Sequence, residues 1–249
     1  MKEERKFFLW LFGYGFVLAF FHIVPTFLSS YLKSPLTWGD GLDFLTPFAV
    51  IPLAYILYSR TSKISLSPMS LLSRGQKAIA KIILAIGFLL YVDGHGLHLS
   101  SNSLSRLLQN VKGSELFRAN YLFDEIISHY MWDGGLFLVS IALMIVSSNL
   151  SFSSISRANS ALLYLGAAFY GFTFTVNGIE GQTVPFTFSA AFVSFLITLA
   201  LYFKSQKRVS QNPILIFFLG AYFLSSLLFA YWGISHSGFP QFSELGWIK

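Results

Sequence analysis

Residues 78–99 have the sequence AIAKIILAIGFLLYVDGHGLHL, a long apolar run that ends in ionisable side chains. About 20 apolar residues in a helix are needed to cross the hydrocarbon core of a bilayer, which is about 30 Å thick. Asp93, His95 and His98 are costly at such a depth unless they face the interior of the protein. The run therefore indicates a transmembrane helix that carries part of a polar site.

The composition of the whole chain supports a membrane protein. Hydrophobic residues make up 54% of the 249 residues and charged residues 11%, whereas ordinary soluble domains carry about 25% charged residues. Cysteine is absent from the sequence, which excludes disulfides, thiolate metal sites and cysteine nucleophiles. We expect an all-α, polytopic integral membrane protein whose residues 1–249 form a single transmembrane helical-bundle domain.

Seven apolar segments are long enough to span a bilayer. The first is longer than the roughly 7–15 apolar residues of a signal peptide and lacks a cleavage site, so we interpret it as a retained span kinked at Pro25. Residues 100–117 carry leucines at helical spacing, which predicts either an amphipathic surface helix or a continuation of the third span. The seven segments are residues 7–30, 42–58, 78–99, 121–147, 160–177, 184–203 and 213–235.

The distribution of positive charge predicts the orientation of these spans. Of the 17 Lys and Arg residues, twelve lie in the N-terminal segment and in the connections on its side of the membrane, and five lie on the other side. The positive-inside rule then places the N-terminus inside and the C-terminus outside. The net charge of +6 is explained by topology, and no contiguous basic patch or motif supports a nucleic-acid partner.

The ionisable residues of the spans gather at one depth. At ~1.5 Å per residue, Asp93 and His95 lie roughly 17–20 Å from the inner end of their helix, and His22 and Asp43 lie near 23 Å in theirs. His22 is alone on an apolar helix, for which we favour a packing role. The other residues that we place at similar or greater depth are His98, Asn102, Asp124, Glu125, His129, Asp133, Glu180 and His236.

Two of the predicted helices carry these groups as stripes. One stripe consists of Tyr91, His95, His98 and Asn102, and the other of Glu125, His129 and Asp133. Residues three or four apart lie on one face of a helix, and polar stripes in a membrane turn away from lipid. We therefore expect both stripes to face one polar pocket that opens to the extracytoplasmic side.

Imidazole and carboxylate groups at this spacing are suitable ligands for zinc, iron or manganese. Zinc is the first candidate, because three or four such ligands leave a position for an activated water. Asp93, Asp124 and Asp133 are predicted to be catalytic groups that orient ligands or transfer protons. The predicted metal ligands are His95, His98, Glu125, His129, Glu180 and His236.

These residues favour a membrane-embedded, metal-dependent enzyme, most simply a hydrolase that acts on a lipid or another apolar substrate. Oxidative di-iron chemistry is the variant if two redox metals bind. A transporter or proton-coupled carrier is the main alternative, and a non-catalytic binding or assembly subunit is another. A carrier should also have ionisable groups in the inner half of the membrane, where the sequence has almost none. The sequence predicts no oligomeric state.

Overall fold

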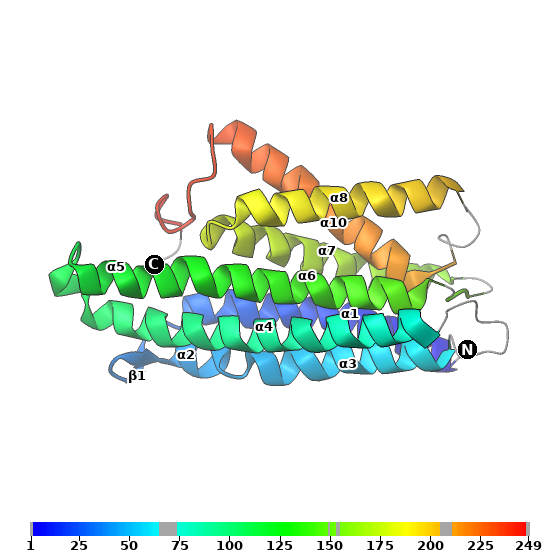
Figure 1. Ribbon diagram of the computed structural model, residues 1–249, viewed down its shortest axis with the longest axis horizontal. Coiled ribbons are helices and arrows are strands. Elements are labelled where there is room, and N and C mark those ends of the chain that lie inside the picture. The colour runs from blue at the N-terminus through cyan, green and yellow to red at the C-terminus, as the bar shows by residue number, and fades with distance from the viewer. Residues whose placement is uncertain (1, 65–73, 149, 153–154, 205–210, 248–249) are drawn as a thin grey trace.

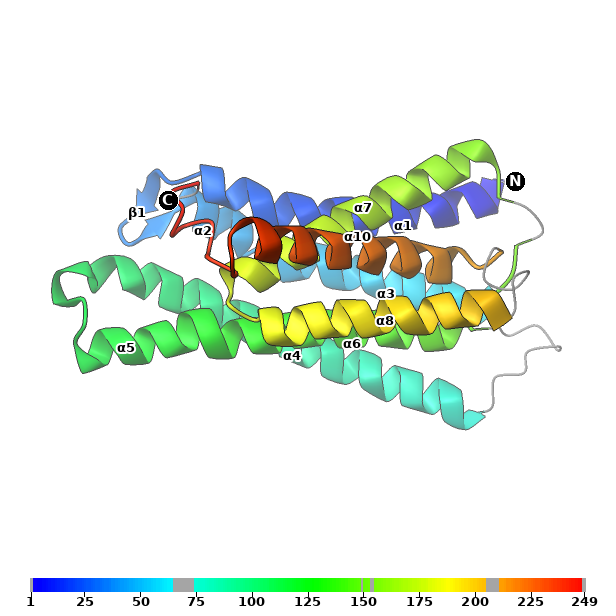
Figure 2. The same cartoon turned by 90° about the horizontal axis from the view of Figure 1, so that it is seen from above.

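A computed structural model describes the chain except residues 1, 65–73, 149, 153–154, 205–210 and 248–249. Its described part contains seven helices that are long and apolar enough to cross a membrane. The long helices lie roughly along one axis, and the first and last helices of the chain place its N and C ends at opposite ends of the bundle (Figure 1 and Figure 2). We refer to these ends as the N-terminal end and the C-terminal end. The predicted bundle of seven apolar helices is thus confirmed.

A short antiparallel hairpin, β1 (Tyr31–Lys33) with β2 (Leu36–Thr37), interrupts the helices between the first and second spans. The helices in chain order are α1 (Lys2–Ile23), the 3-10 helix η1 (Val24–Phe27), α2 (Trp38–Asp43), α3 (Thr46–Ile64), α4 (Arg74–Leu107), the 3-10 helix η2 (Gln109–Val111), α5 (Glu115–Tyr121), the π-helix η3 (Leu122–Ile127), α6 (Ser128–Ser147), α7 (Arg157–Glu180), α8 (Val184–Lys204) and α10 (Pro213–Ser235).

Two helix boundaries refine the sequence prediction. Helix α1 ends at Ile23, and the first span continues through Pro25 as the 3-10 helix η1. Proline lacks an N–H donor and disfavours helical geometry in the residue before it. Helix α4 continues through Leu107, so residues 100–107 extend the third span. No proline or glycine interrupts that part of the chain, which lets the helix continue.

Helices α4 and α6 form the most extensive helix pair in the bundle. Glycines allow their backbones to approach closely, as small residues do at transmembrane helix interfaces. A Cβ atom at Gly94 would lie 2.5 Å from the carbonyl oxygen of Ser128 and 2.5 Å from the backbone nitrogen of Trp132. A Cβ atom at Gly135 would lie 2.5 Å from the backbone nitrogen of Tyr91. The register of the two helices is therefore set by glycine.

Aromatic side chains fill the centre of the bundle. The rings of Tyr14 and Tyr170 lie 5.7 Å apart, and those of Tyr170 and Tyr222 lie 6.1 Å apart. All three residues are fully buried. The outer surface is apolar as well, with Phe48 68% exposed and Leu89 66% exposed. Such an apolar exterior is typical of a surface that faces lipid or another apolar partner.

Arg106, near the end of α4, holds the hairpin and α2 against the bundle. Its Nη1 and Nη2 atoms donate to Asp40 Oδ2 and Oδ1 at 2.5 and 3.0 Å, and Nη1 also donates to the carbonyl oxygen of Pro35. Asp40 Oδ2 accepts a second bond from the backbone nitrogen of Thr37 at 2.7 Å. Bidentate Arg–carboxylate pairs fix orientation as well as distance. The last residue of α2, Asp43, is thereby placed beside α4.

The glycine contact of α4 with α6 can be tested with two glycines of one helix. Gly94→Ala should lower the free energy of unfolding by about 1–3 kcal/mol, because the added methyl group overpacks the interface. A Cβ atom at Gly96 meets nothing within 4 Å, so Gly96→Ala should leave stability unchanged or raise it by up to ~1 kcal/mol through helix propensity. Denaturation of the purified protein in detergent measures both. Equal effects of the two substitutions would contradict the proposed close contact.

Candidate functional site

Four of the five histidines surround one indole, that of Trp132 in α6. The ring centroids of His22, His95, His98 and His129 lie 4.7, 4.9, 5.5 and 5.4 Å from the Trp132 ring. The histidines come from α1, α4 and α6, three helices of the bundle. We call these five residues the histidine cluster.

The close contact of α4 with α6 builds this cluster. Gly94 lies against the backbone of Trp132, so His95 and His98 of α4 are held beside His129 of α6. The two predicted polar stripes therefore do face each other. The sequence predicted an open polar pocket between them, whereas the structure places the buried Trp132 side chain at the centre.

Two histidine–carboxylate pairs lie side by side in the cluster. His98 Nδ1 is 3.0 Å from Oδ1 of Asp124, whose Oδ2 accepts a hydrogen bond from Ser105 Oγ at 3.1 Å. His129 Nε2 is 3.9 Å from Glu125 Oε2. The rings of His98 and His129 lie 4.8 Å apart. The arrangement joins two imidazoles and two carboxylates in one contact network.

The π-helix η3 supplies both carboxylates. Asp124 and Glu125 are consecutive, yet Asp124 pairs with His98 of α4 and Glu125 pairs with His129 of the following helix. Neighbouring residues on a helix point in different directions, about 100° apart in the α form. Two adjacent acids can therefore serve two histidines on different elements. Single π-helical turns within longer helices occur frequently at functional sites.

The structure adds two residues that the sequence analysis did not assign to the site. His95 Nε2 donates to the carbonyl oxygen of Asp43 at 2.9 Å and lies 3.6 Å from its Oδ1 atom. His22 Nδ1 donates to the carbonyl oxygen of Leu18 at 2.6 Å, and its ring packs against Trp132. The common depth of roughly 23 Å was the signal for both residues. His22 does pack, as we expected, but it packs inside the cluster.

Several polar atoms of the cluster are buried and have no hydrogen-bond partner among the residues that the structure describes. They are His22 Nε2, His95 Nδ1, Trp132 Nε1 and both ring nitrogens of His129. Leaving such an atom unpaired costs roughly 1–3 kcal/mol, and most buried polar atoms in native proteins are paired. A purely packing role for the cluster does not explain why several unpaired polar atoms, each destabilising, are buried together. The cluster therefore offers donors and acceptors to a polar ligand.

The structure corrects the sequence-based placement of Asp93. Asp93 precedes His95 by two residues, which is about 200° around an α-helix. Its side chain is exposed, whereas His95 is buried. Asp93 therefore lies outside the histidine cluster. Asp133, which follows Trp132 in α6, is fully buried, and its Oδ2 accepts a hydrogen bond from Thr183 Oγ1 at 2.6 Å.

Two of the predicted metal ligands, Glu180 and His236, also lie outside the histidine cluster. Glu180 Oε2 accepts hydrogen bonds from the backbone nitrogens of Phe242 and Ser243 at 2.7 and 3.4 Å. The ring of His236 stacks on Trp232, with the centroids 4.0 Å apart. These contacts fasten the C-terminal tail to the ends of α7 and α10. The sequence could not reveal that Glu180 binds the tail, because Glu180 and the tail residues are about 60 positions apart in the chain.

The predicted metal site is not preassembled. Among the residues that the structure describes, no three His, Asp or Glu side chains are grouped so that they could hold a metal ion. The physical reason is the Trp132 indole, which the imidazoles surround in place of an ion. His98, His129, Asp124 and Glu125 are the predicted site residues that lie close to one another. Metal binding stays a prediction for this group.

Comparisons of the chain with protein-family models, with curated proteins and with solved structures find no match. The fold and the cluster nevertheless define a class: a helical protein with seven potential membrane spans and a buried histidine–carboxylate site.

Proposed function

We propose that this chain is a membrane-embedded enzyme, most simply a hydrolase, that acts on a lipid or another apolar substrate. The observation that carries the proposal is the pair of adjacent histidine–carboxylate contacts, His98 with Asp124 and His129 with Glu125. An acid and a base in one buried site are the minimum that hydrolysis requires. The surrounding apolar helices give a substrate dissolved in the bilayer direct access to the bundle surface.

The chemistry assigns complementary roles to the two pairs. One imidazole accepts a proton from water while the water oxygen bonds to the acyl carbon, and the other donates a proton to the leaving group as its bond to that carbon breaks. Asp124 orients the His98 ring through their 3.0 Å contact, as the carboxylate of a catalytic triad does. The charges of Asp124 and Glu125 stabilise the protonated forms of the two rings. His95, held by Asp43, and His22 would position the Trp132 ring.

A divalent metal ion, with zinc as the first candidate, belongs to the metal-dependent form of this proposal. Its ligands would come from His98, His129 and their two carboxylates, because imidazole and carboxylate are the ligands that zinc, iron and manganese share. These side chains would have to move toward one another, since no three of them are grouped for an ion in the described part of the structure. The ion would supply an activated water and an electrophile for the substrate carbonyl. Oxidative di-iron chemistry is the corresponding proposal for two redox ions.

We further propose that the N-terminus lies in the cytoplasm and that the histidine cluster faces the extracytoplasmic leaflet. The support is the excess of Lys and Arg at the N-terminal end, to which the positive-inside rule applies. His22 lies next to the last residue of α1, so the cluster is far from that end.

A proton-coupled carrier is the second candidate, and one observation favours it. Buried hydroxyl groups continue from the cluster into the bundle: Tyr91 stacks beside His95, and Tyr14 and Tyr170 pack together in the core. The hydroxyl oxygen of Tyr14 has no hydrogen-bond partner among the described residues. Buried polar chains of this kind can relay protons. A carrier would be favoured if a proton gradient drove uptake of a substrate into proteoliposomes and the protein did not hydrolyse that substrate.

Hydrolysis can be tested with a fluorogenic long-chain acyl ester in mixed micelles. His98→Gln and His129→Gln should each lower kcat by about 100-fold or more, because each removes one acid–base group. His236→Gln is the matched control, since His236 lies outside the cluster, and it should retain activity. Thermal unfolding confirms that each variant is folded. Activity that is equal in all three variants would contradict the assignment of the site.

Elemental analysis of protein purified with divalent metal tests the metal-dependent form. We expect about one ion per chain, as in a single zinc site, and loss of that ion in His98→Gln and His129→Gln. His236→Gln should retain it, because His236 stacks on Trp232 outside the cluster. An ion that survives both histidine substitutions would show that the ligands are wrong. A wild-type protein without stoichiometric metal would leave only the metal-free acid–base mechanism.

The orientation can be tested without background, because the sequence contains no cysteine. Lys112→Cys introduces a thiol in the exposed connection between α4 and α5, and Ala158→Cys introduces one at the exposed start of α7. A membrane-impermeant maleimide should label the first thiol in intact cells and the second only after permeabilisation. The opposite pattern would reverse the proposed topology.

A further inference from the structure

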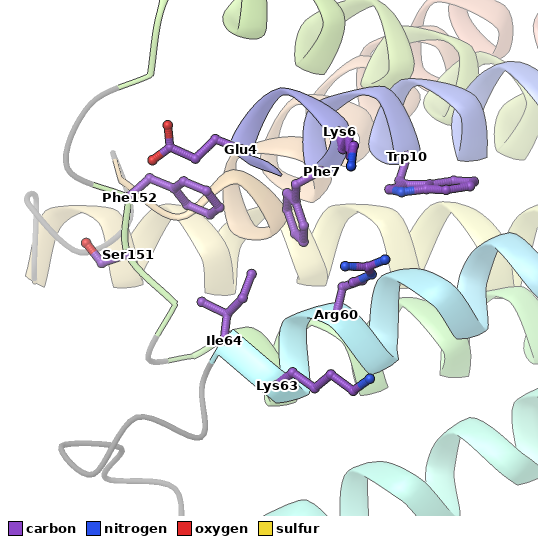
Figure 3. Close-up of a pocket in the computed structure, with 9 residues that line it drawn as sticks. All are labelled: Glu4, Lys6, Phe7, Trp10, Arg60, Lys63, Ile64, Ser151 and Phe152. Atoms are coloured by element: carbon purple, nitrogen blue, oxygen red, sulfur yellow. The ribbon is translucent and has the colours of Figure 1, made fainter. Parts of the chain in front are cut away.

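A second polar feature lies at the N-terminal end of the bundle, far from the histidine cluster. It is a cavity of about 390 Å³ between the start of α1 and the end of α3 (Figure 3). Its polar lining includes Lys6, Arg60, Lys63 and Glu4. Three cations and one carboxylate give the cavity a formal excess of positive charge, so it favours an anionic ligand.

The cations of the cavity come from two different helices. Lys6 belongs to α1, whereas Arg60 and Lys63 belong to the last turns of α3. Arg60 extends from α3 toward α1, into the space beside Phe7 and Trp10 (Figure 3). A guanidinium group binds phosphate with two parallel hydrogen bonds, and lysine adds a point charge. Lys6 and Arg60 thus approach the cavity from two elements, with Lys63 at its edge (Figure 3).

Apart from Ser151, the remaining lining of the cavity is apolar, and contacts with neighbouring residues hold it in place. Phe7 and Phe152 are buried, with ring centroids 5.5 Å apart. The backbone nitrogen of Phe152 donates to the carbonyl oxygen of Gln211 at 2.9 Å, and Ser151 Oγ donates to Gln211 Oε1 at 2.8 Å. Trp10 and Ile64 add further apolar surface. The cavity therefore combines a cationic part with a fixed aromatic wall.

The depth of these groups matches the layers of a phospholipid. Lys6 is four residues after the start of α1 and Arg60 four residues before the end of α3, so each lies ~6 Å inside its helix end. Trp10 lies one further helical turn in, at ~12 Å. Phosphate groups occupy the outer level of a bilayer leaflet, and Trp is enriched at the boundary just beneath it. A free inorganic anion would not need the aromatic wall.

We propose that this cavity binds the phosphate group of an anionic phospholipid. Arg60, Lys63 and Lys6 contact the phosphate, while Phe7 and Trp10 contact the glycerol and the first acyl carbons. Basic pockets between transmembrane helices are known binding sites for such headgroups. The volume is within the range of pockets that hold small ligands, about 300–1,000 Å³. The site is independent of the hydrolase proposed above.

Native mass spectrometry of the full chain in detergent can measure this binding. The probes are phosphatidylglycerol, phosphatidylcholine with the same acyl chains, and inorganic phosphate as a competitor. Phosphatidylglycerol should bind more tightly than phosphatidylcholine. Arg60→Gln combined with Lys63→Gln should weaken phosphatidylglycerol binding about 25-fold, at about fivefold for each charge removed.

A matched control removes the same amount of charge at the same end of the bundle. Arg74 and Lys81 are exposed on α4 and do not line the cavity, so Arg74→Gln combined with Lys81→Gln should leave phosphatidylglycerol binding within about twofold. An equal loss in this control would overturn the site. Equal binding of the two lipids would also overturn it.

Two further outcomes keep the proposal decisive. Displacement of phosphatidylglycerol by inorganic phosphate would show that the cavity binds a free anion, which contradicts a lipid ligand. If the glutamine variant does not fold, as judged by thermal unfolding, Arg60→Lys combined with Lys63→Arg replaces it. This charge-conserving variant should bind phosphatidylglycerol within about threefold of the wild type, and loss of binding would contradict a site governed by charge.

Discussion

The close approach of α4 and α6 is the constraint on which the rest of the site depends. Gly94 and Gly135 let the two backbones come together where any side chain would collide with the partner helix. Gly94 packs against the backbone of Trp132, and His95, His98 and His129 gather around the Trp132 indole. Within a bilayer, apolar burial does not drive helices together, so such close van der Waals contact is a main source of their association.

The site built on this contact lowers the stability of the folded protein. The cluster buries imidazole nitrogens and an indole N–H without partners among the described residues, and buried unpaired polar groups are destabilising. Burial of purely apolar rings, such as those of Phe217 and Phe218, contributes stabilising free energy elsewhere in the bundle. Functional sites often store strain or unpaired polarity in this way. This cost is the physical basis for assigning a chemical role to the cluster.

The two ends of the bundle differ in chemistry. The N-terminal end carries a cationic cavity lined by Lys6, Arg60 and Lys63, which suits an anionic headgroup. The histidine cluster lies near the end of α1 and pairs its imidazoles with carboxylates. A lipid held in the cavity and a substrate at the cluster would occupy opposite leaflets under the proposed orientation. The cationic cavity therefore lies at the end of the bundle where Lys and Arg are in excess, which is the end that the positive-inside rule places in the cytoplasm.

By itself, the sequence determined the seven apolar helices and the two polar stripes, because span length and helical periodicity are local properties. Asp93 shows the limit of depth as a criterion, since it lies at the right depth on the wrong face of α4. Only the tertiary structure decided that Trp132 fills the centre, that His22 joins the cluster and that Glu180 holds the tail. Those contacts depend on how distant helices pack, and helix packing depends on side-chain shape across the whole bundle.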